Sequence, residues 1–145
     1  MPDPELTEPH GKLTVRTLAM PADTNPHGDI FGGWVLSQMD IAGGIAAIEA
    51  AEGRVATVAV EAMTFISPVK VGDILCVYTD IERIGTTSIT VNVEAWARRN
   101  RYGDRLQVTH GRFVFVALDD EGNPRPVKPD QPAADGGASF RPPST

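Results

Sequence analysis

The sequence predicts an α+β fold in which an antiparallel β-sheet wraps around one long central helix. Five segments alternate apolar and polar residues or are dense in valine and phenylalanine, as is typical of β-strands. Short turns separate the later strands, and strands joined in this way pair antiparallel. Only one segment has the length and composition of a long helix, and 145 residues leave room for one domain of this kind.

The first elements are a strand and the helix. Residues 13–18 alternate and predict the strand, and residues 33–51 predict the helix. The apolar residues of the helix are spread over nearly its whole circumference, which indicates a helix buried on every side. They are Trp34, Val35, Leu36, Met39, Ile41, Ala42, Ile45, Ala46, Ala47 and Ile48.

Four more strands follow the helix. Turn signals at Pro68, Gly72–Asp73 and Gly85–Thr86 separate them. The strands are predicted over residues 55–66, 74–84, 87–98 and 106–118. Each is expected to bury one face. In the first, that face holds Val58, Val60 and Ala62, and in the third it holds Ile89, Val91, Val93, Ala95 and Ala97.

The predicted domain covers residues 12–120. Residues 1–11 form a flexible leader, because they are acidic and broken by prolines. Residues 121–145 form a tail rich in proline and glycine, which offers few apolar groups to offset the entropy lost on ordering.

Composition excludes several classes of function. A formal net charge of −6 argues against a nucleic-acid-binding protein, which needs clustered basic surface. The single cysteine, Cys76, lies in an apolar run and is expected to be buried and inert; it excludes a disulfide framework and a cysteine-rich metal site. Residues 30–48 contain four glycines and a carboxylate, so they are a poor membrane span. No secretory signal is recognisable, and a cytoplasmic protein that contacts no membrane is expected.

Asp40 is the first candidate for chemistry. It is the only charged residue in the segment 30–48, and an ionised group among apolar neighbours is costly unless it is paired. Asp40 is therefore either paired or solvent-facing, with no further role, or a functional acid at a cleft or subunit boundary. The glycines at positions 43 and 44 fit the second interpretation if another backbone or a ligand approaches there, but they equally fit packing against a strand.

The segment before the helix supplies candidate donors. Gly32 and Gly33 form a glycine turn that opens directly into the helix, where unpaired N–H groups face the positive end of the helix dipole. Together with a lone acid two turns later, such donors suit acyl transfer. His27 is the histidine nearest this turn and is a weaker candidate. No nucleophile elbow, Walker loop, dinucleotide fingerprint or zinc-protease motif is present.

Two long stretches of the sequence have a distinctive pattern. Residues 18–40 read LAMPADTNPHGDIFGGWVLSQMD, and residues 53–66 read GRVATVAVEAMTFI. Shorter pieces are VGD at 71–73, GTTS at 85–88 and FVFVA at 113–117. Together these segments resemble the hotdog-fold acyl-CoA thioesterases, and among these the YciA-like group. The resemblance covers about residues 13–120 in consistent order, whereas the tail matches no motif.

The resemblance implies a hotdog fold and a homodimer with its active sites between two protomers, usually assembled into a hexamer as a trimer of dimers. It implies that Asp40 is the catalytic acid, that Asn25 is an active-site amide, and that Gly32 and Gly33 form the turn whose N–H polarises the thioester carbonyl. The acid and the amide would reach one site from different subunits. The pair Pro26–His27 departs from the more usual small or amide residues.

The expected reaction is hydrolysis of an acyl-CoA thioester in fatty acid metabolism, with no cofactor and no metal. A thiol with a pKa of about 8.5 can leave as thiolate, so one carboxylate and a set of N–H donors suffice. Asp40 serves as general base or as nucleophile; the residues alone leave both open. Expected substrate contacts are Gly32, His27, Arg54, Thr57, Val58, Lys70, Gly85, Thr86, Thr87 and Ser88, with Arg83, Arg98 and Arg99 as further cations for the nucleotide end.

Two alternatives stay open. A hotdog-type hydratase or dehydratase acting on acyl thioesters needs an acid paired with a histidine, which would have to be His27. A protein that binds acyl-CoA without catalysis would use Asp40 only to seal a subunit boundary. The acyl chain length and the role of the tail are not predicted.

Overall fold

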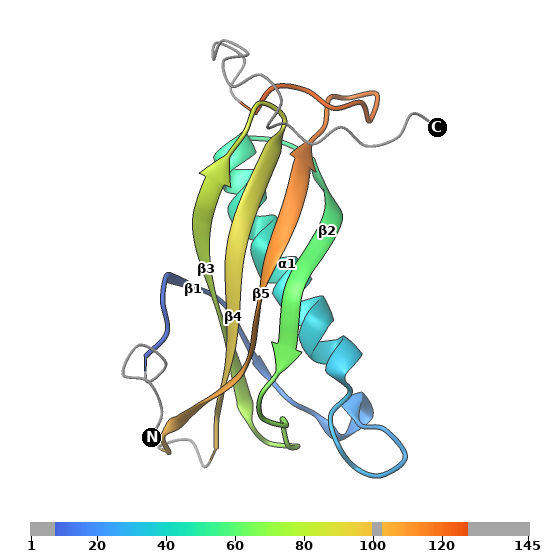
Figure 1. The fold of residues 1–145 in the computed structure, drawn as a ribbon. Helices are drawn as coiled ribbons and strands as arrows, with labels where there is room; N and C mark the ends of the chain where they lie inside the picture. Colours follow the sequence, from blue (N-terminus) through green and yellow to red (C-terminus); the bar gives the residue numbers. More distant parts are fainter. Residues whose placement is uncertain (1–7, 100–102, 128–145) are drawn as a thin grey trace.

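The computed structural model describes residues 8–99 and 103–127 (Figure 1). Five strands form one antiparallel sheet in the order β1-β3-β4-β5-β2. This is the predicted α+β class, and each predicted element is present. The elements are β1 (Lys12–Leu18), the short 3-10 helix η2 (Pro21–Asp23), α1 (Gly32–Ala51), β2 (Val55–Phe65), β3 (Ile74–Ile84), β4 (Ser88–Arg98) and β5 (Arg105–Ala117).

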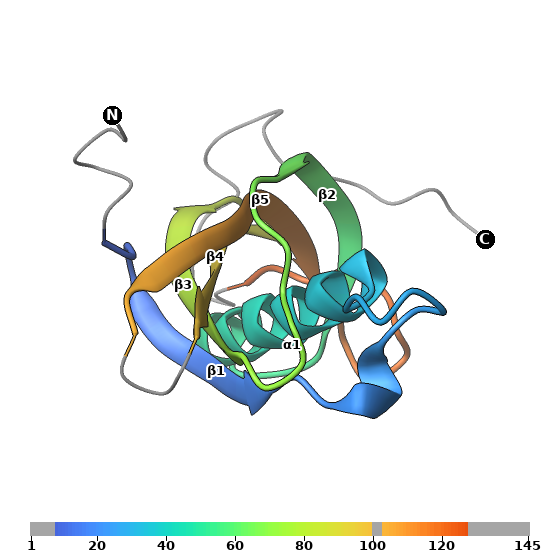
Figure 2. The same ribbon diagram turned by 90° about the horizontal axis from the view of Figure 1, so that it is seen from below.

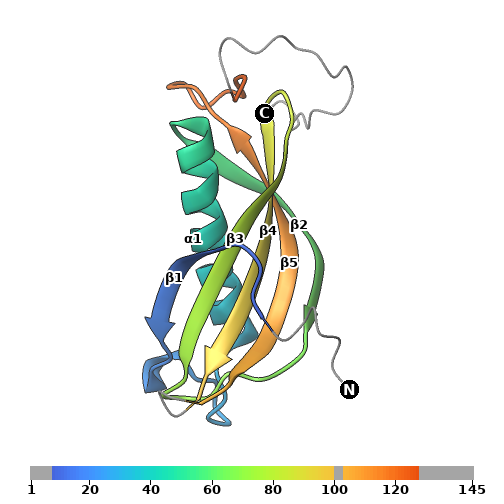
Figure 3. The same cartoon turned by 90° about the vertical axis from the view of Figure 1, so that its left-hand side faces the viewer.

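The sheet curves around α1, which lies along its concave face (Figures 2 and 3). The helix begins after Phe31, whose backbone is extended, and ends at Glu52, whose left-handed φ of 52° stops the helical ladder. Every strand of the sheet contacts α1. One helix therefore fills the hollow of the whole sheet.

The core lies between the concave face of the sheet and one side of α1. The predicted inner face of β4 is confirmed, since all five of its side chains are fully buried: Ile89, Val91, Val93, Ala95 and Ala97. Phe113 and Phe115 of β5 stack beside them with ring centroids 6.4 Å apart. Met39 and Ala42 of α1 complete the layer. β4 is the central strand and is paired with another strand along both of its edges. The strictest alternation of apolar and polar residues in the sequence therefore falls in this strand.

The expectation that α1 is buried on every side is wrong for the single chain. Ile41, Ile45 and Ile48 are 51%, 37% and 48% exposed. The reason is geometric, because one curved sheet covers only one side of a helix, and residues 8–99 and 103–127 form no second layer over the other side. The exposed isoleucines recur at a helical spacing of three and four residues, so they form one continuous apolar stripe along α1.

The predicted buried face of β2 is also wrong. Val60 is 43% exposed and Ala62 is exposed as well. Two register shifts, at Thr57/Ala59 and at Glu61/Thr64, interrupt the pairing of β2 with β5, and Ala62 has a φ of 55°. Each shift moves the following side chains to the other face, so simple alternation fails on this edge strand.

The folded unit extends past the predicted boundary at residue 120 and includes Val127, the last residue that the structure describes. A turn over residues 119–122 reverses the chain, and the Arg125 N–H donates to the Ala117 carbonyl. The Arg125 guanidinium donates to the carbonyls of Leu118 and Ala51, and Val127 is 2% exposed within the core. Residues 1–7 and 128–145, which contain most of the predicted leader and tail, lie outside the described residues.

Cys76 is buried in β3, as expected. Burial raises the pKa of its thiol above the ordinary value, so the neutral form persists at physiological pH. The thiol is therefore unsuited to nucleophilic chemistry.

Candidate active site

The loop before α1 is closed by Asn25. Its side-chain Oδ1 accepts hydrogen bonds from the backbone N–H groups of His27 and Asp29, at 2.9 and 3.1 Å. The Asn25 N–H donates to the Asp29 carbonyl at 2.7 Å, and Gly28 turns the chain with a φ of 83°. Because Oδ1 is occupied within the loop, the side-chain amide group of Asn25 is left as a donor at a defined position.

The N–H groups of Gly32 and Gly33 are open at the start of α1. Intrahelical bonding begins one residue later, with the Trp34 N–H donating to the Phe31 carbonyl at 3.1 Å. Both glycines are exposed, and no acceptor for their N–H groups is found in the part of the chain that the structure describes. The dipole of a helix of 20 residues adds positive potential here, so this turn suits a negatively charged oxygen.

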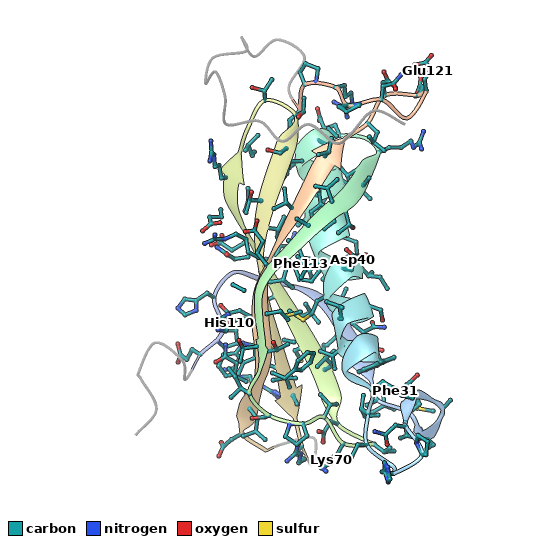
Figure 4. The ribbon with its side chains drawn as sticks, turned by 45° about the vertical axis from the view of Figure 1, so that its right-hand side comes forward. Phe31, Asp40, Lys70, His110, Phe113 and Glu121 are labelled. Atoms are coloured by element: carbon teal, nitrogen blue, oxygen red, sulfur yellow. The ribbon has the colours of Figure 1, made fainter. Side chains whose placement is uncertain are left out.

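Asp40 lies midway along α1, on the side that faces β2 (Figure 4). The Thr57 Oγ1 donates to Asp40 Oδ1 at 2.7 Å. Asp40 is partly exposed, so it is neither sealed in the core nor free in bulk water. The expectation that the carboxylate is paired is confirmed, whereas its role as a functional acid at a cleft or subunit boundary stays a prediction.

Asp40 and the glycine amides of the same chain are too far apart to act together. Asp40 follows Gly33 by seven residues, which corresponds to about 10 Å along a helix axis. A base and an oxyanion donor that share one carbonyl both need to approach its atoms to about 3 Å. Within one chain this pair cannot serve one reaction centre.

The predicted substrate contacts fall into three groups along α1. Gly32, His27 and Lys70 lie at its N-terminal end, where the Lys70 ammonium pairs with Asp29 at 3.1 Å and the His27 side chain is exposed. Thr57 and Val58 lie beside Asp40. The third group lies at the opposite end: Arg54 and the turn residues Gly85, Thr86, Thr87 and Ser88.

Contacts within the third group tie the turn to the end of the fold. The Gly85 N–H donates to the Ser88 carbonyl, and the carbonyls of Thr86 and Thr87 accept from Val127 and Ala117. Arg54 reaches the carbonyls of Asp119 and Asp120 only at 3.5 Å, so its guanidinium is loosely held.

Arg99, one of the further cations expected at the nucleotide end, is engaged elsewhere. Its Nε donates to the buried carboxylate of Asp73 at 3.2 Å, and its Nη2 donates to the Pro68 carbonyl at 2.9 Å. These bonds fasten the loop before β3 to the end of β4. Arg99 is therefore structural.

Sequence reasoning missed that Thr57 is the hydrogen-bond partner of Asp40. Thr57 was expected only to contact substrate. The two residues are 17 positions apart on a helix and on an edge strand, so no local spacing connects them. Their contact depends on how β2 is placed beside α1.

Residues 8–99 and 103–127 contain neither a membrane-spanning helix nor a cluster of metal-ligating side chains. No helix there combines the length and the apolar character needed to cross a membrane. In the same ranges, no three histidine, cysteine or acidic side chains gather where they could hold a metal ion.

Comparison with known proteins shows the family to which the chain belongs. Residues 27–103 match the thioesterase superfamily model. The chain is 54% identical over 122 residues to the acyl-CoA thioester hydrolase YciA of Salmonella typhimurium, covering 82% of this chain and 92% of that protein.

Solved structures agree. The hexameric thioesterase y2039 of Yersinia pestis superposes with a TM-score of 0.80 at 53% identity, covering 83% of this chain and 98% of that one. The hexameric hotdog-fold thioesterase Cj0915 of Campylobacter jejuni has a TM-score of 0.76 at 40% identity, covering 81% and 91%. The helix-in-sheet architecture, the open glycine turn and these similarities lead to one conclusion: the chain belongs to the thioesterase superfamily and has the hotdog fold.

Proposed function

We propose that this protein hydrolyses acyl-CoA thioesters to a carboxylic acid and coenzyme A, with Asp40 as the catalytic carboxylate. The observation that carries the proposal is the Asp40–Thr57 hydrogen bond of 2.7 Å on the accessible side of α1. It holds one carboxylate oxygen and leaves the other available to a substrate or a water molecule. The thioester hydrolase activity named for the relative in Salmonella supports the same reaction.

The reaction centre is formed by two protomers. Asp40 and Gly33 of one chain are about 10 Å apart along the helix axis, so the N–H donors for a given carbonyl come from the second copy. The exposed stripe of Ile41, Ile45 and Ile48 is apolar surface that a second chain can cover. The protein is accordingly a homodimer, and the hexameric neighbours favour its assembly into a hexamer as a trimer of dimers.

Each protomer contributes a different part of the mechanism. The thioester carbonyl oxygen accepts from the Gly33 N–H, with Gly32 beside it, and the side-chain amide of Asn25 donates to the carbonyl or to the water. Asp40 takes a proton from that water while the oxygen of the water bonds to the carbonyl carbon. The negative charge passes to the carbonyl oxygen, the C–S bond then breaks, and coenzyme A leaves as thiolate.

A direct attack by Asp40 is the second route through the same site. Its carboxylate would displace the thiolate to form a mixed anhydride, which water would then cleave. Both routes need the same ionised oxygen, and neither requires a cofactor.

Coenzyme A is anionic at its nucleotide end. Arg54 is the best placed cation for it, since its guanidinium is exposed and only loosely bonded. The turn at 85–88 lies at the same end of the fold. Thr57, with Val58 next to it in the chain, contacts Asp40. Lys70 and His27 lie at the other end. We place the enzyme in the cytoplasm and in fatty acid metabolism.

The test compares Asp40→Asn with the wild type by thiol release from a panel of acyl-CoAs. Asparagine keeps the shape and an oxygen that can accept from Thr57, so only the basic, charged oxygen is lost. Release is expected to fall by about 10²-fold or more. Glu49→Gln, the same chemical change at an exposed position of the same helix, is the control and should retain full activity.

Other outcomes contradict the proposal in distinct ways. Unchanged release by Asp40→Asn refutes the role of Asp40. If the wild type releases no thiol from any acyl-CoA yet binds the ligands, the protein is a binding protein. If it hydrates enoyl-CoA instead, it is a hydratase.

A further inference from the structure

A pocket of about 330 Å³ opens beside the first turn of α1. Gly32 forms part of its wall, and no ionisable side chain lines it. Val35, Val69 and Val108 are at most 3% exposed and close its inner end. Apart from Ser67, its lining side chains are apolar, so the pocket is a mostly apolar space that adjoins the glycine turn.

The position of this pocket restricts what can occupy it. A thioester carbonyl bound at the glycine turn carries two substituents, the sulfur of coenzyme A and the acyl chain. The coenzyme side is long and charged, and this pocket offers it no charged partner. The acyl chain is apolar and starts one bond from the carbonyl carbon, so it matches both the location and the lining.

We propose that this pocket binds the acyl chain and that Phe65 determines which chain lengths fit. The inference rests on the proposed function, because the carbonyl has to lie at the glycine turn. It assigns a specificity residue in addition to the catalytic groups.

Phe65 is the wall of the pocket that lies against the glycine turn. A Cβ atom added to Gly32 would lie 3.4 Å from the Cζ atom of the Phe65 ring, so the ring packs directly over that glycine. The backbone that follows is held in place, since the N–H groups of Ile66 and Ser67 both donate to the Val108 carbonyl, at 2.7 and 3.3 Å. The ring is therefore positioned by its own strand end and not by a flexible loop.

The inner and outer walls of the pocket differ in how easily they can change. The valines at the inner end are part of the core, whereas Phe65 and Ile66 are 49% and 53% exposed. Substitution of Phe65 thus alters the pocket without removing a core side chain. A volume of about 330 Å³ is at the lower end of the range for ligand pockets, which favours short and medium acyl chains.

The test measures kcat/KM of the full-length protein for straight-chain substrates from acetyl-CoA to palmitoyl-CoA. For the wild type, kcat/KM should rise about fourfold per added methylene while the chain is being buried, and then level off. Phe65→Ala should move the levelling-off point to longer chains, and Phe65→Trp should move it to shorter ones. Leu18→Ala removes a side chain of similar exposure that does not line the pocket, and should leave the profile unchanged.

The outcomes separate the pocket from the reaction. If both Phe65 variants remain folded and active with the wild-type profile, the pocket assignment is overturned while the hydrolase stands. A shift of the same kind in Leu18→Ala overturns it as well. Should the wild type release no thiol from any member of the series, the proposed function fails, and the pocket assignment fails with it. Phe65→Leu, a smaller change, replaces Phe65→Ala if thermal unfolding shows that the latter does not fold.

Discussion

Replacing Gly43 by alanine is expected to destabilise the fold, whereas the same change at its neighbour Gly44 is not. An added Cβ at Gly43 would lie 3.1 Å from two ring carbons of Phe115 and 3.4 Å from a methyl of Val93. Both neighbours are at most 1% exposed, and a close-packed core gives little room for them to move. At Gly44 the nearest atom, on Phe115, is 3.8 Å away, which is an ordinary contact.

The magnitude follows from two opposing terms. Alanine gains about 1 kcal/mol over glycine inside a helix at either position. Overpacking at Gly43 costs about 1–3 kcal/mol, so the net change there is a loss of about 1 kcal/mol. Gly44→Ala keeps the gain in helix stability, because the added Cβ meets no close neighbour. The two variants should therefore differ by about 2 kcal/mol, or roughly 4–8 °C in Tm.

Urea denaturation and thermal unfolding of the three proteins check this difference. All measurements use one protomer concentration, because assembly contributes to the apparent stability. Equal stability of the two variants would refute the packing explanation. A loss of thiol release in Gly44→Ala without a loss of stability would show that this glycine makes room for a ligand or a second chain.

Three other predictions concern the site, the thiol and the helix surface. Thr57→Val should lower kcat about tenfold with little change in KM, because it removes a hydrogen bond that positions Asp40, and Thr57→Ser should restore most of it. Cys76 should react with a thiol reagent only on unfolding. Burial raises the pKa of the Cys76 thiol in the folded state, so the unfolded chain loses the thiol proton first as the pH rises. The contribution of Cys76 to the free energy of unfolding is therefore complete below a pH of about 8.5 and declines above it. Ile41→Glu should produce smaller assemblies by sedimentation velocity, whereas Val71→Glu, at an exposed turn position, should not.

The agreement between sequence and structure is best where a strand is central. In β4, five alternating positions were expected inside, and all five are buried. Alternation is a local property of the chain, and it survives when both strand edges are paired and one face meets the helix. On β2 the same reasoning failed at Val60 and Ala62, because bulges on an edge strand change the face that each residue presents.

The helix illustrates a different limit. Its apolar residues were correctly identified as residues that need cover, but the cover was assigned to the chain's own sheet. Ile41, Ile45 and Ile48 are instead on the open side. Composition shows that a surface is apolar; it does not show whether the covering atoms belong to the same chain.

By itself, the sequence determined the α+β class, the order of its elements, the family, and Asp40 with the glycine turn as candidates for chemistry. These features follow from residue types and from their spacing over short stretches of the chain. Only the tertiary structure decided that Thr57 holds Asp40 and that Gly43 packs on Phe115. Those relations join segments distant in sequence, and they are set by strand register and by the placement of α1 in the sheet, which no local pattern encodes.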